Sequence, residues 1–238
     1  MSSSAATQAF TLLGSLPHSI RSERPRRRRW VVTMRDRSNN PRPLQKGRNL
    51  SIEAIQTVQA LKRAQKYHNS LEQAFDFKFR RLLKLDMVAV LRELLRQNEC
   101  LLALKVFEDI RREYWYKPRV SLYAEVIGVL GSNGFFEQVE IVHLYLKSEA
   151  SLQPEIEGFN ALLRTLISFE RAELAMECYD LMKQVGCDPD RSTFRILING
   201  LESVEETGSS AVVRLDAQNF YGESLDFLEQ EEELTLTH

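Results

Sequence analysis

The stretch that decides the fold runs from Pro154 to Pro189 and reads PEIEGFNALLRTLISFERAELAMECYDLMKQVGCDP. Its two prolines are 35 residues apart, and a third, Pro118, lies 36 residues before the first. Proline cannot continue a helix and shifts the preceding residue away from helical geometry, so each of these positions ends a helical segment. A fixed period of 35 to 36 residues predicts stacked helical hairpins.

Apolar side chains recur at equivalent positions in four successive units. Within each unit they are four and then three residues apart, which places them on one stripe of a helix. The three columns are Met87/Tyr123/Phe159/Phe194, Leu91/Ile127/Leu163/Ile198 and Leu94/Leu130/Leu166/Leu201. A second helix follows a break at Asn98 in one unit and at Gly134 in the next. The sequence therefore predicts an all-α solenoid of helical hairpins with a period of 35–36 residues.

The repeats are expected at about 49–83, 84–119, 120–155, 156–190 and from 191 onward, and the first of them is degenerate. Residues 202–238 are expected to form an irregular last repeat and an acidic C-terminal cap or tail. Residues 202–210 are polar and predict a loop. A final helix over 221–230 would then supply the polar cap that the end of a solenoid needs.

The segment TFRILINGL, Thr193–Leu201, resembles the opening of a pentatricopeptide repeat, and residues 156–190 match that repeat best. The 34-residue tetratricopeptide repeat fits less well because no unit has its tryptophan. The resemblance implies a right-handed α-solenoid that binds RNA, with one base read per repeat. The short array and the basic leader are similar to the small plant organellar members of the family. They are most similar to the thylakoid-assembly type, which assists splicing of chloroplast group II introns.

The resemblance also implies where bases are read. The main readers would be the fifth residues of the first helices, and the second readers would be the last residues of the units. These are Val88, Ala124, Asn160 and Arg195, followed by Arg119, Glu155 and Asp190. Asn160 with Asp190 matches the family pair that prefers uracil. Val88 and Ala124 cannot hydrogen-bond a base, so we expect a short or degenerate RNA site.

Phosphate contacts would supply part of the affinity. Arg92 and Arg96 are four residues apart on one predicted helix, and Arg164 occupies the column of Arg92. Together with Arg195 they are candidates to line the groove, and their binding would weaken with salt because bound phosphates release counterions. The alternative is that they are ordinary exposed arginines in weak ion pairs on helix surfaces.

Charge is distributed unevenly along the chain, although the formal net charge is −1. Residues 1–48 hold eleven Lys/Arg and two acids, a net of +9, and residues 199–238 hold ten acids and one arginine, a net of −9. The intervening residues therefore sum to −1, which argues against strong, indiscriminate binding of nucleic acid.

The leader has no acidic residue over Met1–Ser22, is rich in Ser, Thr and Ala, and is followed by four arginines at 26–29. This composition predicts a transit peptide for the chloroplast stroma, with the mitochondrion as the alternative. A basic arm that stays attached and binds RNA or a nuclear importer is the other interpretation.

Catalytic and metal-binding motifs are not found. Cys100, Cys178 and Cys187 form no CxxC pair, and the sequence has no P-loop, glycine-rich dinucleotide turn or zinc spacing. His143 lies in the column of Phe107 and Tyr179, which predicts a core histidine. We expect no enzyme activity, no metal and no cofactor. No apolar run approaches the length of a membrane span.

Two functions from different classes remain. The first is an organellar RNA-binding protein whose partners are single-stranded intron RNA and other splicing factors, and which acts by holding intron segments single-stranded. The second is a scaffold for protein–protein interactions, in which the groove takes a peptide or a helix as tetratricopeptide arrays do.

Overall fold

The computed structural model describes residues 50–66, 70–222 and 225–228, which belong to one compact unit, residues 47–238. The predicted transit peptide and basic arm, residues 1–48, lie outside the described residues.

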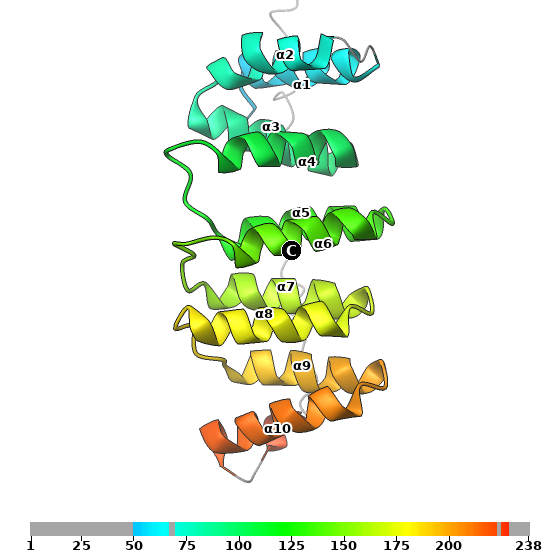
Figure 1. The fold of residues 1–238 in the computed structure, drawn as a ribbon, viewed down its shortest axis with the longest axis vertical. Helices are drawn as coiled ribbons and strands as arrows, with labels where there is room; N and C mark the ends of the chain where they lie inside the picture. The colour runs from blue at the N-terminus through cyan, green and yellow to red at the C-terminus, as the bar shows by residue number, and fades with distance from the viewer. Residues whose placement is uncertain (1–49, 67–69, 223–224, 229–238) are drawn as a thin grey trace, which may run out of the picture. The chain divides into compact units, whose positions relative to one another are not determined.

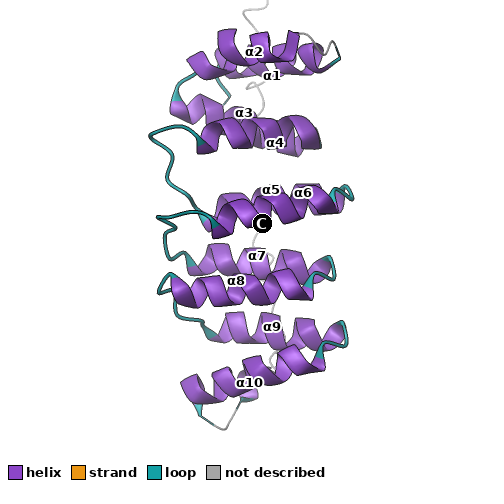
Figure 2. Cartoon of the chain, viewed as in Figure 1, coloured by secondary structure: helices purple, strands orange, loops and turns teal. Residues whose placement is uncertain are grey.

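The described residues form α-helices, two short 3-10 helices and loops, without a strand (Figure 2). The α-helices are α1 (Ile52–Gln65), α2 (Leu71–Phe77), α3 (Lys84–Arg96), α4 (Cys100–Arg111), α5 (Val120–Ser132), α6 (Phe136–Lys147), α7 (Ile156–Ser168), α8 (Ala172–Gln184), α9 (Arg191–Ser203) and α10 (Thr207–Tyr221). The 3-10 helices are η3 (Phe79–Arg81) and η4 (Asp226–Leu228). The predicted all-α class is confirmed.

The helices form hairpins that follow one another in chain order (Figure 1). Each odd-numbered helix packs against the even-numbered helix that follows it. In addition, α7 packs against both α5 and α9. Contacts between the second helices α6 and α8 are sparser. The first helices therefore make a continuous layer, which is the solenoid arrangement that the apolar columns predict.

In the four hairpins from α3 to α10, the turn contains one residue in the left-handed backbone conformation. Asn98 (φ 56°), Gly134 (φ 78°), Glu170 (φ 58°) and Glu205 (φ 64°) occupy these turns. They recur every 36, 36 and 35 residues, so the repeat is visible in the backbone as well as in the side chains. The sequence marks the first two of these turns, at Asn98 and Gly134, and the structure adds those at Glu170 and Glu205.

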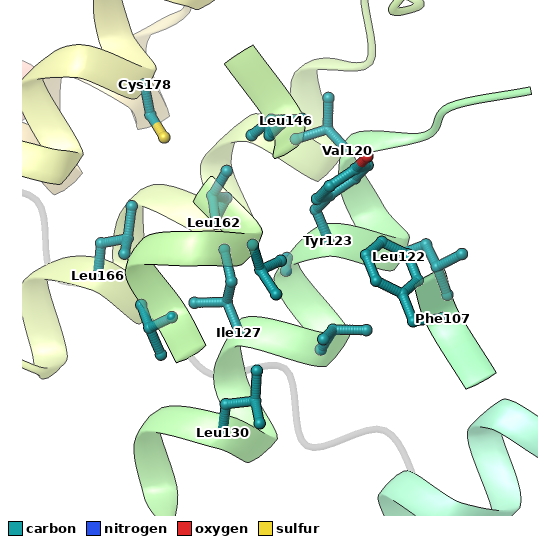
Figure 3. Close-up of a cluster of buried hydrophobic side chains, with 14 of the residues drawn as sticks. Phe107, Val120, Leu122, Tyr123, Ile127, Leu130, Leu146, Leu162, Leu166 and Cys178 are labelled. Atoms are coloured by element: carbon teal, nitrogen blue, oxygen red, sulfur yellow. The ribbon is translucent and has the colours of Figure 1, made fainter. Parts of the chain in front are cut away.

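The core lies between the two helices of each hairpin and continues into the next hairpin (Figure 3). The ring of Tyr123 on α5 meets that of Phe107 on α4 edge to face, with 5.1 Å between centroids. Leu162 and Leu166 on α7 are fully buried in the same core. The columns predicted from the sequence are buried throughout, with Met87, Tyr123, Phe159 and Phe194 all 2% exposed or less.

The prediction that His143 is a core residue is confirmed. His143 is buried on α6, and burial lowers the pKa of its imidazole, which is thereby kept neutral. Cys178 is fully buried on α8, and burial raises the pKa of its thiol.

The predicted positions of the helix and the loop in the C-terminal region were wrong. The polar stretch 202–210 is not a loop, because α9 extends to Ser203 and α10 begins at Thr207. The predicted helix 221–230 does not form as predicted. Among its described residues, Tyr221 is the last residue of α10, which Gly222 ends at φ 86°, and only the short η4 follows. The reason is packing: Ser210, Val213 and Ala217 lie on one face of α10 and are buried.

The first unit also differs from a regular hairpin. Its second helix, α2, ends at Phe77, and η3 carries the chain on to α3. Phe75 and Phe79, one from each element, are fully buried and meet edge to face at 5.5 Å. This aromatic contact replaces the last turns of a longer helix.

Candidate nucleic-acid interface

The exposed side of the first-helix layer carries the predicted reading positions. Between α5 and α7 this side has a hollow of about 410 Å³, lined in part by Ala124, Gly128, Ser132, Thr165 and Ser168. Asn98, Glu125, Val129 and Phe169 complete the lining, so the hollow combines small side chains with a carboxylate and an aromatic ring.

The predicted reader Asn160 and its partner Asp190 are in direct contact. Asn160 lies on α7 and is 6% exposed, while Asp190 is the N-cap residue of α9. The Nδ2 of Asn160 donates to Oδ1 of Asp190 at 3.2 Å. A third residue, Thr193 on α9, donates its hydroxyl to Oδ1 of Asn160 at 2.7 Å. We call these three residues the amide cluster.

The same atoms also begin α9. The backbone N–H of Thr193 donates to Oδ1 of Asp190 at 2.7 Å, and the backbone N–H of Asp190 donates to the Thr193 hydroxyl oxygen at 3.2 Å. This reciprocal capping box satisfies donors that the first turn of a helix leaves unpaired. The helix start thus fixes the position of the carboxylate that holds Asn160.

The Asp190 carboxylate is ionised in this setting. Burial by itself raises its pKa, but the hydrogen bonds from the Thr193 backbone and from Asn160 lower it, and the net pKa is below its ordinary value. An ionised carboxylate can only accept hydrogen bonds, so the Asn160 atom that faces it must be the NH₂ group.

Two of the predicted phosphate contacts, Arg92 and Arg96, make ion pairs instead of standing apart. Arg92 forms two hydrogen bonds of 3.1 Å to Glu125 on α5, and about half of its side chain is exposed. Arg96 forms two hydrogen bonds of 2.9 and 2.7 Å to the buried Glu93, which raises the pKa of its guanidinium. These contacts agree with the second interpretation of the sequence, in which the arginines form ion pairs on helix surfaces.

Arg164 and Arg195 lie beside the amide cluster. Arg164 is exposed on α7, and its Nη2 is 3.5 Å from the hydroxyl of Ser192 on α9. Arg195 is half-buried on α9, five residues after Asp190. Together with Asn160 and Asp190, these arginines place a donor, a carboxylate and two cations on α7 and at the start of α9.

The remaining predicted readers offer no polar group to a base. Val88 is half-buried and Ala124 is 7% exposed. Among the last residues of the units, Glu155 accepts a hydrogen bond of 3.2 Å from the backbone N–H of Ser121, so it ties α7 to α5. Arg119 is exposed.

Sequence reasoning missed Thr193, Glu125 and Glu93. A signal for Thr193 was present, because threonine three residues after an aspartate is a capping pattern. The residues equivalent to Thr193 in the two preceding units are Leu122 and Gly158. Neither carries a hydroxyl. A signal for Glu93 was also present, because a glutamate three residues before an arginine has the spacing of an ion pair on a helix. No sequence signal marked Glu125, because its partner Arg92 lies on another helix.

The described residues contain no group of three or more His, Cys, Asp or Glu side chains arranged to hold a metal ion. Within that same part of the chain, no helix is long and apolar enough to cross a membrane.

Comparison with known proteins places this arrangement in a family. The model of the PPR repeat family matches residues 154–202. A pentatricopeptide repeat-containing protein of Arabidopsis thaliana is 32% identical over 152 residues, which cover 64% of this chain and 77% of that protein. This chain belongs to the pentatricopeptide repeat family. Another Arabidopsis thaliana protein, "Protein THYLAKOID ASSEMBLY 8, chloroplastic", is 34% identical over 193 residues, covering 74% of this chain and 81% of that protein.

A solved structure extends the likeness to three dimensions. This pentatricopeptide repeat chain matches the crystal structure of THA8 in complex with Zm4 RNA with a TM-score of 0.64 and 25% sequence identity. The match covers 76% of this chain and 100% of that one. The helical solenoid of that structure is therefore present here.

Proposed function

We propose that this protein binds single-stranded RNA along its first-helix layer and acts as a splicing factor for chloroplast group II introns. The observation that carries the proposal is the direct contact between Asn160 and Asp190, at the two reading positions of the best-matching unit. Two comparisons support it: the likeness to a protein named for thylakoid assembly and the likeness to a structure that contains RNA.

The mechanism needs no covalent step. Asn160 and Asp190 contact one base edge, while Arg164 and Arg195 contact phosphates next to that base. Arg92 and Arg96 are paired with carboxylates and must leave them before they can contact a phosphate. A protein of this kind promotes splicing by holding a short intron segment single-stranded until the ribozyme has folded.

The leader supports a place of action. Its basic, Ser-rich composition is typical of transit peptides, and relatives with chloroplastic in their names share the repeats. We infer that residues 1–48 direct the protein to the chloroplast. The mitochondrion is the alternative that an import assay with isolated organelles of both kinds tests.

The first test is a triple variant, Asn160→Ala with Arg164→Ala and Arg195→Ala. Affinity for single-stranded RNA should fall by more than about tenfold, and the slope of log K against log salt should shrink by about 1.4, or about 0.7 for each lost phosphate contact. The matched control, Lys105→Ala with Lys183→Ala, also removes two positive charges but from the second helices, and should retain binding. Unchanged affinity in a correctly folded triple variant would contradict the proposal.

The second test identifies the RNA. Transcripts that co-purify with the tagged full-length protein from isolated chloroplasts should be enriched for group II intron segments, with mitochondria treated in parallel. Recovery of proteins without RNA from both organelles would instead favour the scaffold function. The observation that favours that function is the neutralisation of Arg92 and Arg96, which leaves the groove of that unit with little net charge.

A further inference from the structure

The amide cluster contains a residue that has no part in the two-residue reading scheme. Thr193 belongs to the unit after that of Asn160, yet its side chain reaches back to it. Thr193 is fully buried, so its hydroxyl is out of reach of any base. Its effect on RNA must therefore pass through Asn160.

The acceptor and the donor that contact the Asn160 amide fix it in one orientation. The Asp190 carboxylate accepts one N–H of the amide, and the Thr193 hydroxyl donates to the amide oxygen. The reverse orientation would turn the carbonyl oxygen of Asn160 toward an ionised carboxylate, two acceptors without a proton between them. The two contacts use one N–H and the carbonyl oxygen of the Asn160 amide. Its second N–H is the group that they leave for a base.

The Thr193 hydroxyl has one proton and two acceptors in range. Oδ1 of Asn160 lies at 2.7 Å and Oδ1 of Asp190 at 2.8 Å. Asp190 already accepts from the Thr193 backbone N–H and from Asn160, whereas the Asn160 oxygen has no other donor among the described contacts. Donation to Asn160 therefore satisfies the group that would otherwise be buried without a partner, which is costly.

We propose that Thr193 is a positioning residue for base recognition, which holds the Asn160 amide so that an N–H, and not the carbonyl oxygen, is presented to the base. This inference rests on the proposed RNA-binding function. The N–H requires an acceptor on the base, and the adjoining Asp190 carboxylate favours a base N–H beside that acceptor. Uracil and guanine carry this N–H on the ring beside an exocyclic carbonyl oxygen, whereas cytosine and adenine carry the two groups in exchanged places, with the acceptor on the ring and the N–H on the exocyclic amino group.

The other described units lack this device. The positions equivalent to Thr193 are Leu122 and Gly158, and the readers that they would serve are Val88 and Ala124. The chemistry for discriminating bases is thus concentrated in the unit of residues 156–190. The RNA should be read strongly at one nucleotide and weakly at its neighbours.

The test measures base discrimination with the full-length protein. A pool of random 12-nucleotide single-stranded RNAs is bound and one enriched sequence is chosen. Every single-base variant of it is then titrated. The nucleotide at which Asn160→Ala abolishes discrimination is the one read by Asn160. At that nucleotide we expect a preference of roughly tenfold for the keto base over cytosine, as a specific base contact gives.

Thr193→Val removes the hydroxyl at constant size and should reduce that preference to about twofold, and Thr193→Ser should restore it. Because each preference is a ratio within one protein, partial loss of the helix cap cancels. In the Asn160→Ala background, Thr193→Val should change nothing, since the amide it orients is gone. A merely structural role would lower affinity equally for all bases and in both backgrounds.

The possible failures are distinguishable. If the wild-type protein binds no RNA from the pool, the proposed function is wrong. If it binds with a preference that Asn160→Ala abolishes while Thr193→Val leaves the preference intact, the function stands and the role of Thr193 is refuted. A wild-type preference that is insensitive to Asn160→Ala at every nucleotide also refutes it.

Discussion

Single side chains decide how much positive charge the first-helix layer offers to RNA. Arg92 lies on the exposed side of that layer, but Glu125 from the next unit holds its guanidinium in a two-point contact. Exposed pairs of this kind contribute little to stability, about 1 kcal/mol at most. Their consequence is for binding, since the arginine must leave its carboxylate before it can contact a phosphate.

Glu125→Gln should therefore raise the affinity for single-stranded RNA, by about two- to fivefold at low salt, because Arg92 becomes available for one further phosphate contact. The salt slope should steepen by about 0.7. Glu137→Gln on α6 removes the same charge from the second-helix side and should leave both quantities unchanged. Equal gains in the two variants would mean that net charge, not the pair with Arg92, matters.

Asp190 makes stability depend on pH. Its folded-state pKa is below the ordinary aspartate value, so the folded state is favoured by its ionised form. That contribution is fully present above the unfolded-state pKa, about 3.9, and is lost as the pH falls through the lower folded-state pKa. Asp190→Asn should destabilise the protein by about 1 kcal/mol at neutral pH and by less near pH 3. Urea unfolding at both pH values measures the difference, and a pH-independent loss would contradict the assignment.

At this scale the sequence indicates residue types but not their partners. Asn160 and Asp190 could be paired in advance because their columns align with a family pattern. The partner of Arg92 could not be predicted, because Glu125 lies on another helix and their pairing depends on which rotamers meet between the two helices. The pair of Arg96 with Glu93 has ordinary i,i+3 helix spacing, but spacing alone does not show which rotamers the two side chains adopt.

The hairpin turns show how an element imposes a backbone conformation. Four turns place one residue at positive φ, and two of these residues are glutamates. A side chain with a Cβ is strained in this conformation, whereas glycine is not. The sequence indicated the turns at Asn98 and Gly134, since Asn and Gly tolerate the conformation. It did not place the turn at Glu170, because glutamate carries no such signal.

Glu170→Gly should stabilise the protein by up to about 1 kcal/mol by relieving this strain, partly offset by the greater freedom of glycine in the unfolded chain. Gly134→Ala, the reciprocal change in the preceding hairpin, should destabilise by about 1 kcal/mol. Chemical denaturation of the two variants provides the measurement. Changes of the same sign in both would mean that φ is not the controlling variable.

For the whole array, each hairpin is stabilised mainly by its neighbours. α9 buries Phe194, Ile198 and Leu201, and α10 packs directly against it. Aromatic rings at the end of α10 complete the cover, since Phe220 and Tyr221 lie within 6 Å of the Phe194 ring centroid. The periodic columns predicted the stack, but the cap was misplaced because α10 buries small and polar residues that resemble a loop.

A chain that ends after Val204 should therefore lose amide protection first in α9 and then in α7, while α1 to α5 keep theirs, since contacts in a solenoid extend only to neighbouring units. Hydrogen exchange followed by mass spectrometry, with the full chain as the reference, resolves these segments. A uniform loss of protection along the whole array would show that it unfolds as a single cooperative globule.

The amide cluster also has a consequence for protein engineering. Asn160 and Asp190 lie inside one sequence repeat, whereas Thr193 lies in the following one. A module grafted into another array with cuts at residues 156 and 190 would leave its buttressing hydroxyl behind. Transplants should carry three further residues, or the recipient should supply threonine or serine at the third place of its next module.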